Sequence, residues 1–413
     1  MKISLLNKFL YLLLSLSLFV GFYFGEDSSG SGGFVNDFNN TWQLVLAFQN
    51  NLFFDFTLLT IHFPLHYIIL SQIQNLIEDQ YILRFIFCLI SLVIPYLFYL
   101  CLKTKFDKIN KNLLYLFSLV IFLLPSFRSG AIWANSQITA LIFFLVSLFF
   151  FIVWVKEEKY NKINSNLFLQ IFFMSLAVYT RQLYAIIFLF FMCIYFEKFK
   201  LKNFIYVGMI VFLLALPGFF IVFNLPSTLT TSFDTKFYNS ILINSSIISF
   251  FLIPIYLIVF FDKTINFNFL SRKNIFIYLF AFLFVLLLSR YFDYNFKVGG
   301  GFFLKLSVLG FDNFYLFFLS SLIGIILLAL LSFEDKNNFI LIIFLIFGFT
   351  SFHIFQKYYE PMFLMLLFTV MKSEIVEKFL KNVKNIFFLY VYIILYLLSA
   401  IANDIFQITK NIY

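Results

Sequence analysis

Long and uninterrupted apolar runs recur along the whole chain. Examples are residues 82–102, 131–155, 203–222 and 314–331. In total, 62% of the residues are hydrophobic and 12% are charged, against roughly 45–50% and 25% in soluble domains. Backbone polar groups inside hydrocarbon must be satisfied internally, so only helices or closed barrels span a bilayer, and continuous rather than alternating runs favour helices. The sequence therefore predicts an all-α, polytopic transmembrane helical bundle.

Basic residues set the orientation of the expected spans. Lys and Arg gather in short loops between the apolar runs, and such loops lie on the cytoplasmic side of a membrane. The basic loops are 103–111, 156–162, 198–202, 262–273 and 372–384. The net charge of +9 is therefore a topology signal, and we exclude nucleic acid as a partner.

The segment that follows the first span carries no Lys or Arg. We interpret Met1–Phe24 as an uncleaved first span, which places the acidic outer loop 25–80 on the outer face. Its apolar part, 61–77, is predicted to be an interfacial helix interrupted near Pro64. One more crossing there would deliver the lysines of loop 103–111 to the outside.

If every basic loop lies on the cytoplasmic side, the number of spans between two successive basic loops must be even. This condition gives about thirteen crossings, with the C-terminus outside. The expected spans are 9–24, 82–102, 113–127, 131–155, 167–180, 183–196, 204–223, 241–261, 275–290, 312–333, 339–352, 361–371 and 385–402. Several are shorter than the roughly 20 residues of a full crossing, which implies a thinned site or half-helices. We expect one integral-membrane domain, residues 1–413.

The outer loop is the first candidate site. The carboxylates of Glu26, Asp27 and Asp37 are suited to act as a general base. Asp27 and Asp37 are also candidate ligands for a divalent cation, Mg or Mn, through oxygen. A solvated polar linker is the ordinary alternative, because loops rich in Gly, Ser and Asp are common.

Outward-facing basic residues at helix ends form the second candidate group. They oppose the positive-inside trend, and Arg and Lys are the side chains that recognise phosphate. For any one of them, snorkelling or helix capping is the alternative. The group comprises Arg128, Arg181, Arg290, Lys297 and Lys357, with Gln182, Tyr358 and Glu360 beside them in the sequence.

His62 and His66 are four residues apart and would share one face of a helix. That spacing can ligate zinc, but no Glu of the HExxH type accompanies it and Pro64 disturbs the turn. We favour a polar contact from this segment to the outer loop or to a substrate.

Aromatic residues beside the charges would stack on sugar rings or form the ordinary interfacial belts. They are Trp42, Trp133, Tyr179, Tyr184, Tyr358 and Tyr359.

The order of these elements resembles the GT-C class of integral-membrane glycosyltransferases, which use polyprenyl-phosphate-linked sugars. After the acidic loop, HFPLHYIIL is similar to the family's Pro-containing segment and QYILRFIFCLISLVIPYLFYLCLK to its second span. RSGAIWANSQITALIFFLVSLFF and AVYTRQLYAIIFLF resemble its middle spans, and QKYYEPMFLMLL resembles a late one. The detailed similarity covers residues 9–196, so 1–196 is the expected catalytic half and 197–413 holds further spans. The chain has Glu-Asp at 26–27 where the family has Asp-Glu, and Phe-Pro at 63–64 where it has Pro-Pro.

The resemblance implies inverting transfer of a hexose or pentose on the periplasmic face of a bacterial inner membrane. The partners would be a polyprenyl-phosphate-linked sugar donor, a lipid or glycan acceptor, and membrane lipid. Asp27 would be the first choice of catalytic base, with Asp37 second and Glu26 beside them. The basic residues would neutralise the departing phosphate, while His66 and Tyr67 would line the entrance.

Two other classes remain open. A lipid-linked glycan flippase or transporter would also need intramembrane cations, but it should show internal repeats with broken helices in matching halves. The second half of the sequence contains no repeat of segment 25–80. An O-antigen polymerase or ligase places its main outer loop late in the chain, whereas here the longest polar outer segment comes first.

Overall fold

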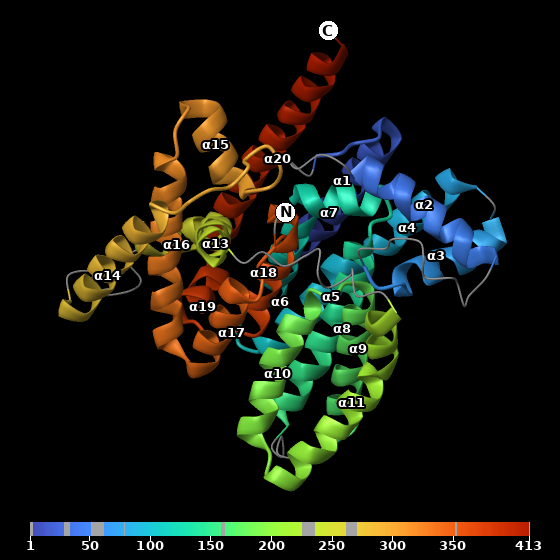
Figure 1. Ribbon diagram of the computed structural model, residues 1–413, viewed down its shortest axis with the longest axis horizontal. Coiled ribbons are helices and arrows are strands. Elements are labelled where there is room, and N and C mark those ends of the chain that lie inside the picture. Colours follow the sequence, from blue (N-terminus) through green and yellow to red (C-terminus); the bar gives the residue numbers. More distant parts are fainter. Residues whose placement is uncertain are drawn as a thin grey trace. The chain divides into compact units, whose positions relative to one another are not determined.

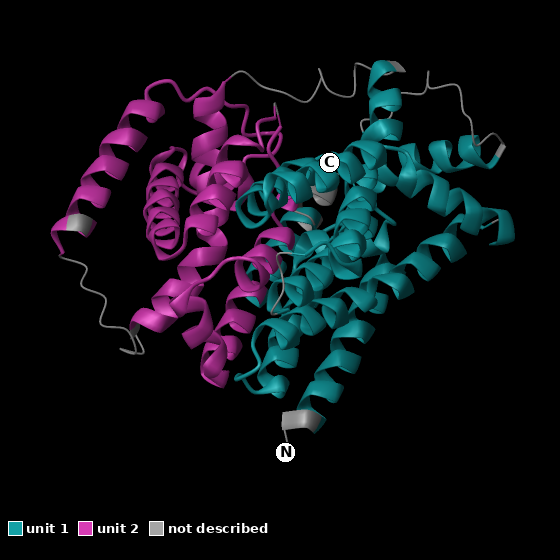
Figure 2. Cartoon of the chain, turned by 90° about the horizontal axis from the view of Figure 1, so that it is seen from below, with its two compact units in different colours: residues 1–231, 394–413 teal, residues 232–393 magenta. Residues whose placement is uncertain are grey.

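The protein is all-helical wherever the computed structural model describes it. The described residues are 3–28, 34–50, 62–77, 79–157, 162–224, 236–261, 271–351 and 353–412, and every regular element within these ranges is a helix. This confirms the predicted fold class. The chain forms two compact units (Figure 2): unit 1 is residues 1–231 with 394–413, and unit 2 is residues 232–393. The expected boundary after residue 196 falls inside unit 1 and stays a prediction.

Seven helices of the described ranges are long and apolar enough to cross a membrane. They are Leu5–Phe24, Gln80–Lys105, Ser136–Lys156, Leu201–Phe223, Phe237–Phe260, Tyr315–Glu334 and Val383–Asp404. One bent pair of helices also passes the test when taken together, and four further apolar helices are shorter. This set fits a multi-pass membrane protein. It does not confirm the count of about thirteen crossings, because several expected spans form helices too short to cross alone.

Unit 1 begins with a long helix, and it includes the last part of the chain's final helix, Val383–Ile412, from residue 394 onward, in addition to the elements given next. Its helices are α1 (Ile3–Phe24), α2 (Phe34–Asn50), α3 (Leu65–Ile77), α4 (Gln80–Ser91), α5 (Val93–Lys105), α6 (Lys111–Ser118), the 3₁₀ turn η1 (Leu119–Leu123), α7 (Pro125–Ile132), α8 (Ser136–Lys156), α9 (Ser165–Thr180), α10 (Tyr184–Lys198) and α11 (Leu201–Asn224). Helices α8 to α11 lie side by side (Figure 1), and α8 also packs along α5. The polar turns at one end of these helices carry the candidate site.

The expected outer loop contains two of these helices. Helix α3 starts directly after Pro64, where a proline is compatible with the beginning of a helix but not with its interior. With 13 residues, α3 is too short to cross a bilayer alone. Helix α2 packs against it, and Leu44, Phe48 and Tyr67 form a small buried cluster between them.

The expected span 113–127 is broken. The chain leaves η1 through Leu124, which has extended backbone angles (φ −76°, ψ 121°), and Pro125 then begins α7. A proline restricts the preceding residue to extended conformations and is favoured at the first helical position. The two halves meet at an angle of 67°. Arg128 therefore lies within a short, fully buried helix and not at the end of a straight span.

Unit 2 is organised around α13. Its elements are α13 (Phe237–Phe261), α14 (Arg272–Ser289), α15 (Gly301–Phe311), α16 (Tyr315–Glu334), α17 (Lys336–Phe347), the 3₁₀ turn η2 (Gln356–Tyr358), α18 (Met362–Thr369), α19 (Glu374–Lys381) and the first part of α20 (Val383–Ile412). Helices α13 and α16 approach closely through small residues, since the Ser246 and Ser320 hydroxyls are 2.6 Å apart. A side chain on Gly324 would overlap the Ser245 carbonyl, so glycine permits this close crossing.

Candidate functional site

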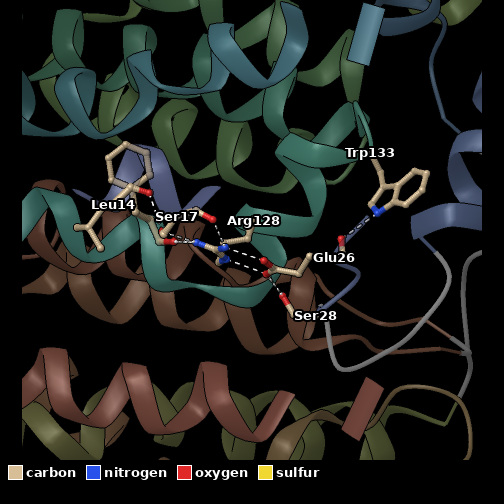
Figure 3. Close-up of polar contacts among 7 residues, drawn as sticks. Leu14, Ser17, Glu26, Ser28, Arg128 and Trp133 are labelled. Carbon is tan, nitrogen blue, oxygen red and sulfur yellow. Dashed lines mark hydrogen bonds and ion pairs between the residues drawn. The ribbon is translucent and has the colours of Figure 1, made fainter. Parts of the chain in front are cut away.

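Glu26 and Arg128 form a bidentate ion pair inside unit 1 (Figure 3). Arg128 Nε and Nη2 donate to the two carboxylate oxygens at 2.7 and 2.6 Å, and the side chains are only 5% and 11% exposed. The other three N–H groups of the guanidinium donate to Ser17 Oγ, the Ser17 carbonyl and the Phe122 carbonyl. All five donors of Arg128 are thus used within the protein. This geometry favours a role in holding α1, η1 and α7 together.

The backbone around Glu26 is adapted to this ion pair. A Cβ atom on Gly21 would overlap Glu26 Oε2 and crowd Arg128 Nη2, so glycine lets the charges lie directly on α1. The Glu26 N–H donates to the Gly21 carbonyl at 2.9 Å, and Ser28 Oγ donates to Glu26 Oε1 at 2.6 Å. Trp133 Nε1 donates to the Glu26 carbonyl at 2.9 Å. Glu26 is therefore an anchor at the start of the expected outer loop.

Asp27 lies at the beginning of α2. Its Oδ2 accepts a hydrogen bond from the Val35 N–H at 3.3 Å, where the helix macrodipole favours a negative charge. The Asp27 N–H in turn donates to the carboxylate of Asp404 from the last part of α20, which belongs to unit 1. Asp27 is 7% exposed. Sequence reasoning missed Asp404, because nothing local connects the two ends of the chain.

Asp37 and Arg181 are connected through one amide. Asn135 Nδ2 lies 3.4 Å from Asp37 Oδ2, and Asn135 Oδ1 accepts from Arg181 Nη2 at 3.3 Å. Asn135 is also the N-cap of α8, where Oδ1 accepts from the Gln137 N–H at 3.0 Å. Because this cap fixes the orientation of the Asn135 amide, the start of α8 contacts both the carboxylate of Asp37 from α2 and the guanidinium of Arg181 from the α9–α10 turn. Asp37 is half-buried.

Arg181 is a buried cation whose side-chain partners are all neutral. It is 5% exposed; Nε donates to Ser136 Oγ at 3.0 Å, and Nη2 lies 3.4 Å from His62 Nε2. Because a guanidinium only donates, His62 Nε2 must accept, and Nδ1–H then points to Gln182 Oε1 at 3.4 Å. Within the described ranges no carboxylate forms an ion pair with Arg181, and its Nη1 has no hydrogen-bond acceptor. A buried charge without a counter-ion is a strong indication of an anion site.

His66 and Tyr67 support this cluster from α3. Fully buried His66 donates from Nε2 to the Ala134 carbonyl at 2.9 Å, and its Nδ1 lies 2.9 Å from Thr139 Oγ1. Ala134 has a positive φ of 44°, a conformation that alanine rarely adopts. Burial lowers the pKa of His66 to about 3, so the imidazole is neutral. Burial likewise raises the pKa of Tyr67 to about 12, with opposing smaller effects from nearby Arg181 and Asp37.

A second arginine, Arg84, contacts the first residues of the α7–α8 turn. Arg84 Nε donates to the Ile132 carbonyl at 3.0 Å, and its guanidinium lies 3.6 Å from the centre of the Trp133 ring. The rings of Phe22 and Phe38 are each 5.3 Å away. Arg84 and Arg181 thus contact consecutive parts of one turn. From the sequence, Trp133 was predicted only to stack on a sugar ring or to belong to an interfacial aromatic belt.

The remaining predicted site residues belong to unit 2. Arg290 and Lys297 are exposed, Tyr358 is half-buried, and Lys357 is 8% exposed with its ammonium 5.0 Å from the Phe355 ring centre. Glu360 is fully buried. Their participation in one site with unit 1 stays a prediction.

The proposed divalent-cation ligands do not gather into a metal cluster. Across the ranges that the structure describes, no group of three or more His, Cys, Asp or Glu side chains is arranged to hold a metal ion. Asp27 is directed to the N-terminus of α2 and Asp37 to Asn135. A divalent-cation site formed by Asp27 and Asp37 stays a prediction.

The apolar helices fit a multi-pass membrane protein, and unit 1 adds a polar cluster of Asp37, Asn135 and Arg181. Comparisons with protein-family models, curated proteins and solved structures found no match to this chain. Sequence reasoning missed Asn135 and Ser136. Their signal was present, because Asn directly before a long apolar run is typical of a helix N-cap.

Proposed function

We propose that unit 1 carries the transfer site of a GT-C-like glycosyltransferase. The enzyme would move a hexose or pentose from a polyprenyl-phosphate donor to a lipid or glycan acceptor, on the periplasmic face of a bacterial inner membrane crossed about thirteen times. The single observation that carries the proposal is the Asp37–Asn135–Arg181 connection. It brings a half-buried carboxylate and a buried cation without a counter-ion to the same turn.

The proposed reaction is a displacement at the anomeric carbon. Asp37 accepts the proton of the acceptor hydroxyl, whose oxygen attacks the anomeric carbon from the face opposite the phosphate. The bond between that carbon and the phosphate oxygen breaks, the electron pair leaves with the phosphate, and the configuration inverts. Arg181 Nη1 donates to the departing polyprenyl phosphate, where fixed donors stabilise developing charge.

This proposal reverses the order of the two expected bases. Asp27 is 7% exposed and its carboxylate already accepts from the first turn of α2, whereas Asp37 is half-buried and adjoins Asn135. A general base must be within hydrogen-bond reach of the proton that it removes. Asp37 meets that requirement better, and Asp27 becomes a residue that orders α2.

The test is sugar transfer in proteoliposomes supplied with radiolabelled polyprenyl-phosphate glucose, mannose and arabinose, and with native membrane lipid as acceptor. We expect Asp37→Asn to lower the rate about 10²–10⁴-fold and Arg181→Gln about 10²–10³-fold. Asp79→Asn is the matched control, because Asp79 is an exposed carboxylate of the same segment that lies outside the cluster, and Asn can also cap α4. Full activity of Asp27→Asn, Asp37→Asn and the double variant would refute the assignment.

A flippase or transporter of lipid-linked glycans is the second candidate function. The observation that favours it is the 67° break between η1 and α7, since broken helices are typical of carriers. Proteoliposomes with a fluorescent lipid-linked glycan in one leaflet separate the two functions. Movement between leaflets without glycosyl transfer would support the carrier, whereas an O-antigen polymerase or ligase would lengthen or transfer a whole glycan.

A further inference from the structure

Helix α4 carries a cation close to the start of a candidate membrane span. Arg84 belongs to the span Gln80–Lys105, and the start of this span lies beside the end of α1, since the Phe22 and Tyr81 rings are 4.9 Å apart. Tyr23 and Tyr81 are exposed at this level. Exposed aromatic side chains at the ends of spans are typical of the membrane–water interface. Arg84 is therefore at the depth of the lipid headgroups.

The guanidinium of Arg84 is held in one orientation. Its central carbon lies 3.6 Å from the centre of the Trp133 ring and 5.3 Å from the centres of the Phe22 and Phe38 rings. Its Nε donates to the Ile132 carbonyl at 3.0 Å. Guanidinium groups stack on aromatic faces in this manner. Three rings and one carbonyl thus fix the plane of the guanidinium before any ligand binds.

The two terminal nitrogens of Arg84 face outward. In the part of the chain that the structure describes, they have no hydrogen-bond acceptor and no ion-pair partner, and both have accessible surface. The acids at this level are engaged elsewhere. Glu26 pairs with Arg128 at 2.6 Å, and Asp79 accepts from the first N–H groups of α4. The positive charge of Arg84 is therefore available to a ligand from outside.

A phosphate group is the ligand that this arrangement fits. Two parallel N–H donors of a guanidinium match two oxygens of a phosphate. A cation on the outer side of a span is costly unless it meets an anion or the polar interface. Arg84 offers a single positive charge, which matches the single negative charge of a phosphodiester.

The surface of α4 beside Arg84 fits the acyl chain of the same ligand. Tyr81, Phe85 and Leu89 follow one another at four-residue spacing, so they share one face of the helix. All three are exposed, and we call them the α4 face. They belong to a candidate span, where the surrounding solvent is hydrocarbon. A phosphodiester at Arg84 and a hydrocarbon chain along the α4 face are parts that a phospholipid combines.

We propose that Arg84 and the α4 face bind one membrane phospholipid, whose phosphodiester accepts from the two terminal nitrogens of Arg84. This site does not depend on the glycosyltransferase proposal. Arg84 stacks on Trp133, at the turn that leads to Asn135 and the start of α8. The bound lipid thus attaches this turn of unit 1 to the surface of the bilayer.

The test uses the full-length protein, purified in a mild maltoside detergent and freed of lipid. It is mixed with phosphatidylglycerol or with a diglucosyl diacylglycerol of identical chains, and native mass spectrometry counts the lipids retained. The glycolipid has no phosphate. We therefore expect about tenfold less retention of the glycolipid, the effect of losing one charge-assisted hydrogen bond. Arg84→Gln should remove this difference between the two lipids.

Lys103→Gln is the matched control, because it removes one exposed cation near the other end of the same span. It should keep the preference for phosphatidylglycerol. A phosphatidylglycerol with a photoreactive group on its acyl chain tests the unmodified protein. Labelling should concentrate on peptides containing residues 81–89, and excess phosphatidylglycerol, but not the glycolipid, should compete with it.

Three results would overturn the proposal. They are equal retention of the two lipids by the wild type, equal losses in Arg84→Gln and Lys103→Gln, and labelling spread evenly over the spans. Displacement of phosphatidylglycerol by sodium phosphate, but not by sodium chloride of equal ionic strength, would show that free phosphate is the ligand instead.

Discussion

Replacing Arg128 by Met separates a structural arginine from a substrate-binding one. The substitution keeps the apolar stem but removes all five donors, and it leaves Glu26 with 11% exposure and no cation. Arg181→Gln is the contrasting change, since it removes a buried charge that has only neutral partners. Arg128→Met leaves the Glu26 carboxylate buried without its cation, whereas Arg181→Gln leaves no ion-pair partner behind.

The magnitude follows from the burial of the pair. Breaking a buried ion pair by removing one partner costs about 3–5 kcal/mol. With about 2–4 °C of melting temperature per kcal/mol for a unit of this size, Arg128→Met should melt about 6–20 °C lower than the wild type. Arg181→Gln should stay within about 1 kcal/mol of the wild type in stability, because no charge is left unpaired. Its defect should appear in transfer activity instead.

The assay is intrinsic tryptophan fluorescence during heating of the detergent-solubilised protein. Lys198→Met is the control, because its pair with Glu197 is a partly exposed contact at 3.9 Å, and such pairs contribute at most about 1 kcal/mol. Adding Glu26→Gln to Arg128→Met should recover part of the loss, since the stranded charge is then removed. A wild-type melting temperature for Arg128→Met, together with a strongly lowered one for Arg181→Gln, would show that the two roles are exchanged.

Three further predictions concern local features of both units. Gly21→Ala should lower stability by about 1–3 kcal/mol because its methyl group overlaps the Glu26–Arg128 pair, whereas Gly208→Ala, with open space around it, should be neutral or slightly stabilising in the same melt. The pKa of His66 is about 3 when folded and near 6.5 when unfolded. Its contribution to stability should therefore be constant above pH 6.5 and fall as the pH drops from 6.5 towards 3, where the unfolded state binds more protons. His66→Asn should remove this component, and pH profiles of the two proteins that differ by a constant offset would contradict it. Gly324→Val should separate α13 from α16, because a side chain there overlaps the Ser245 carbonyl, and lower the melting temperature more than Leu319→Val on the exposed face.

The predictable part of the fold follows from patterns that are local in sequence. The apolar run 82–102 lies within the continuous candidate span Gln80–Lys105. Helix α3 starts directly after Pro64, the residue at which the expected helix 61–77 was interrupted. Pro125 is present in the sequence of the expected span 113–127, but the break that it causes was not predicted. A proline at the first helical position can extend a bend or begin a new helix, and the 67° angle depends on packing of α7 that the sequence does not display.

The candidate site was predictable by residue type and not by pairing. Glu26, Asp37 and Arg181 were recognised as candidates because charges are rare in such a chain. Which acid contacts which base depends on helices separated by about a hundred residues, as in the Glu26–Arg128 pair. Asn135 was missed because a helix cap looks structural in a sequence, and only the arrangement in space shows that it also connects Asp37 with Arg181.

Unit 1 is discontinuous, since residues 394–413 return to it after the whole of unit 2 has been made. During synthesis on the ribosome, the Asp27 N–H can meet the carboxylate of Asp404 only when translation is nearly finished. The segment that follows α1 therefore completes this contact only after the final helix has been made. A stop codon anywhere from 394 to 404 should consequently remove this acceptor of the Asp27 N–H, whereas a stop codon after 404 leaves Asp404 in the product.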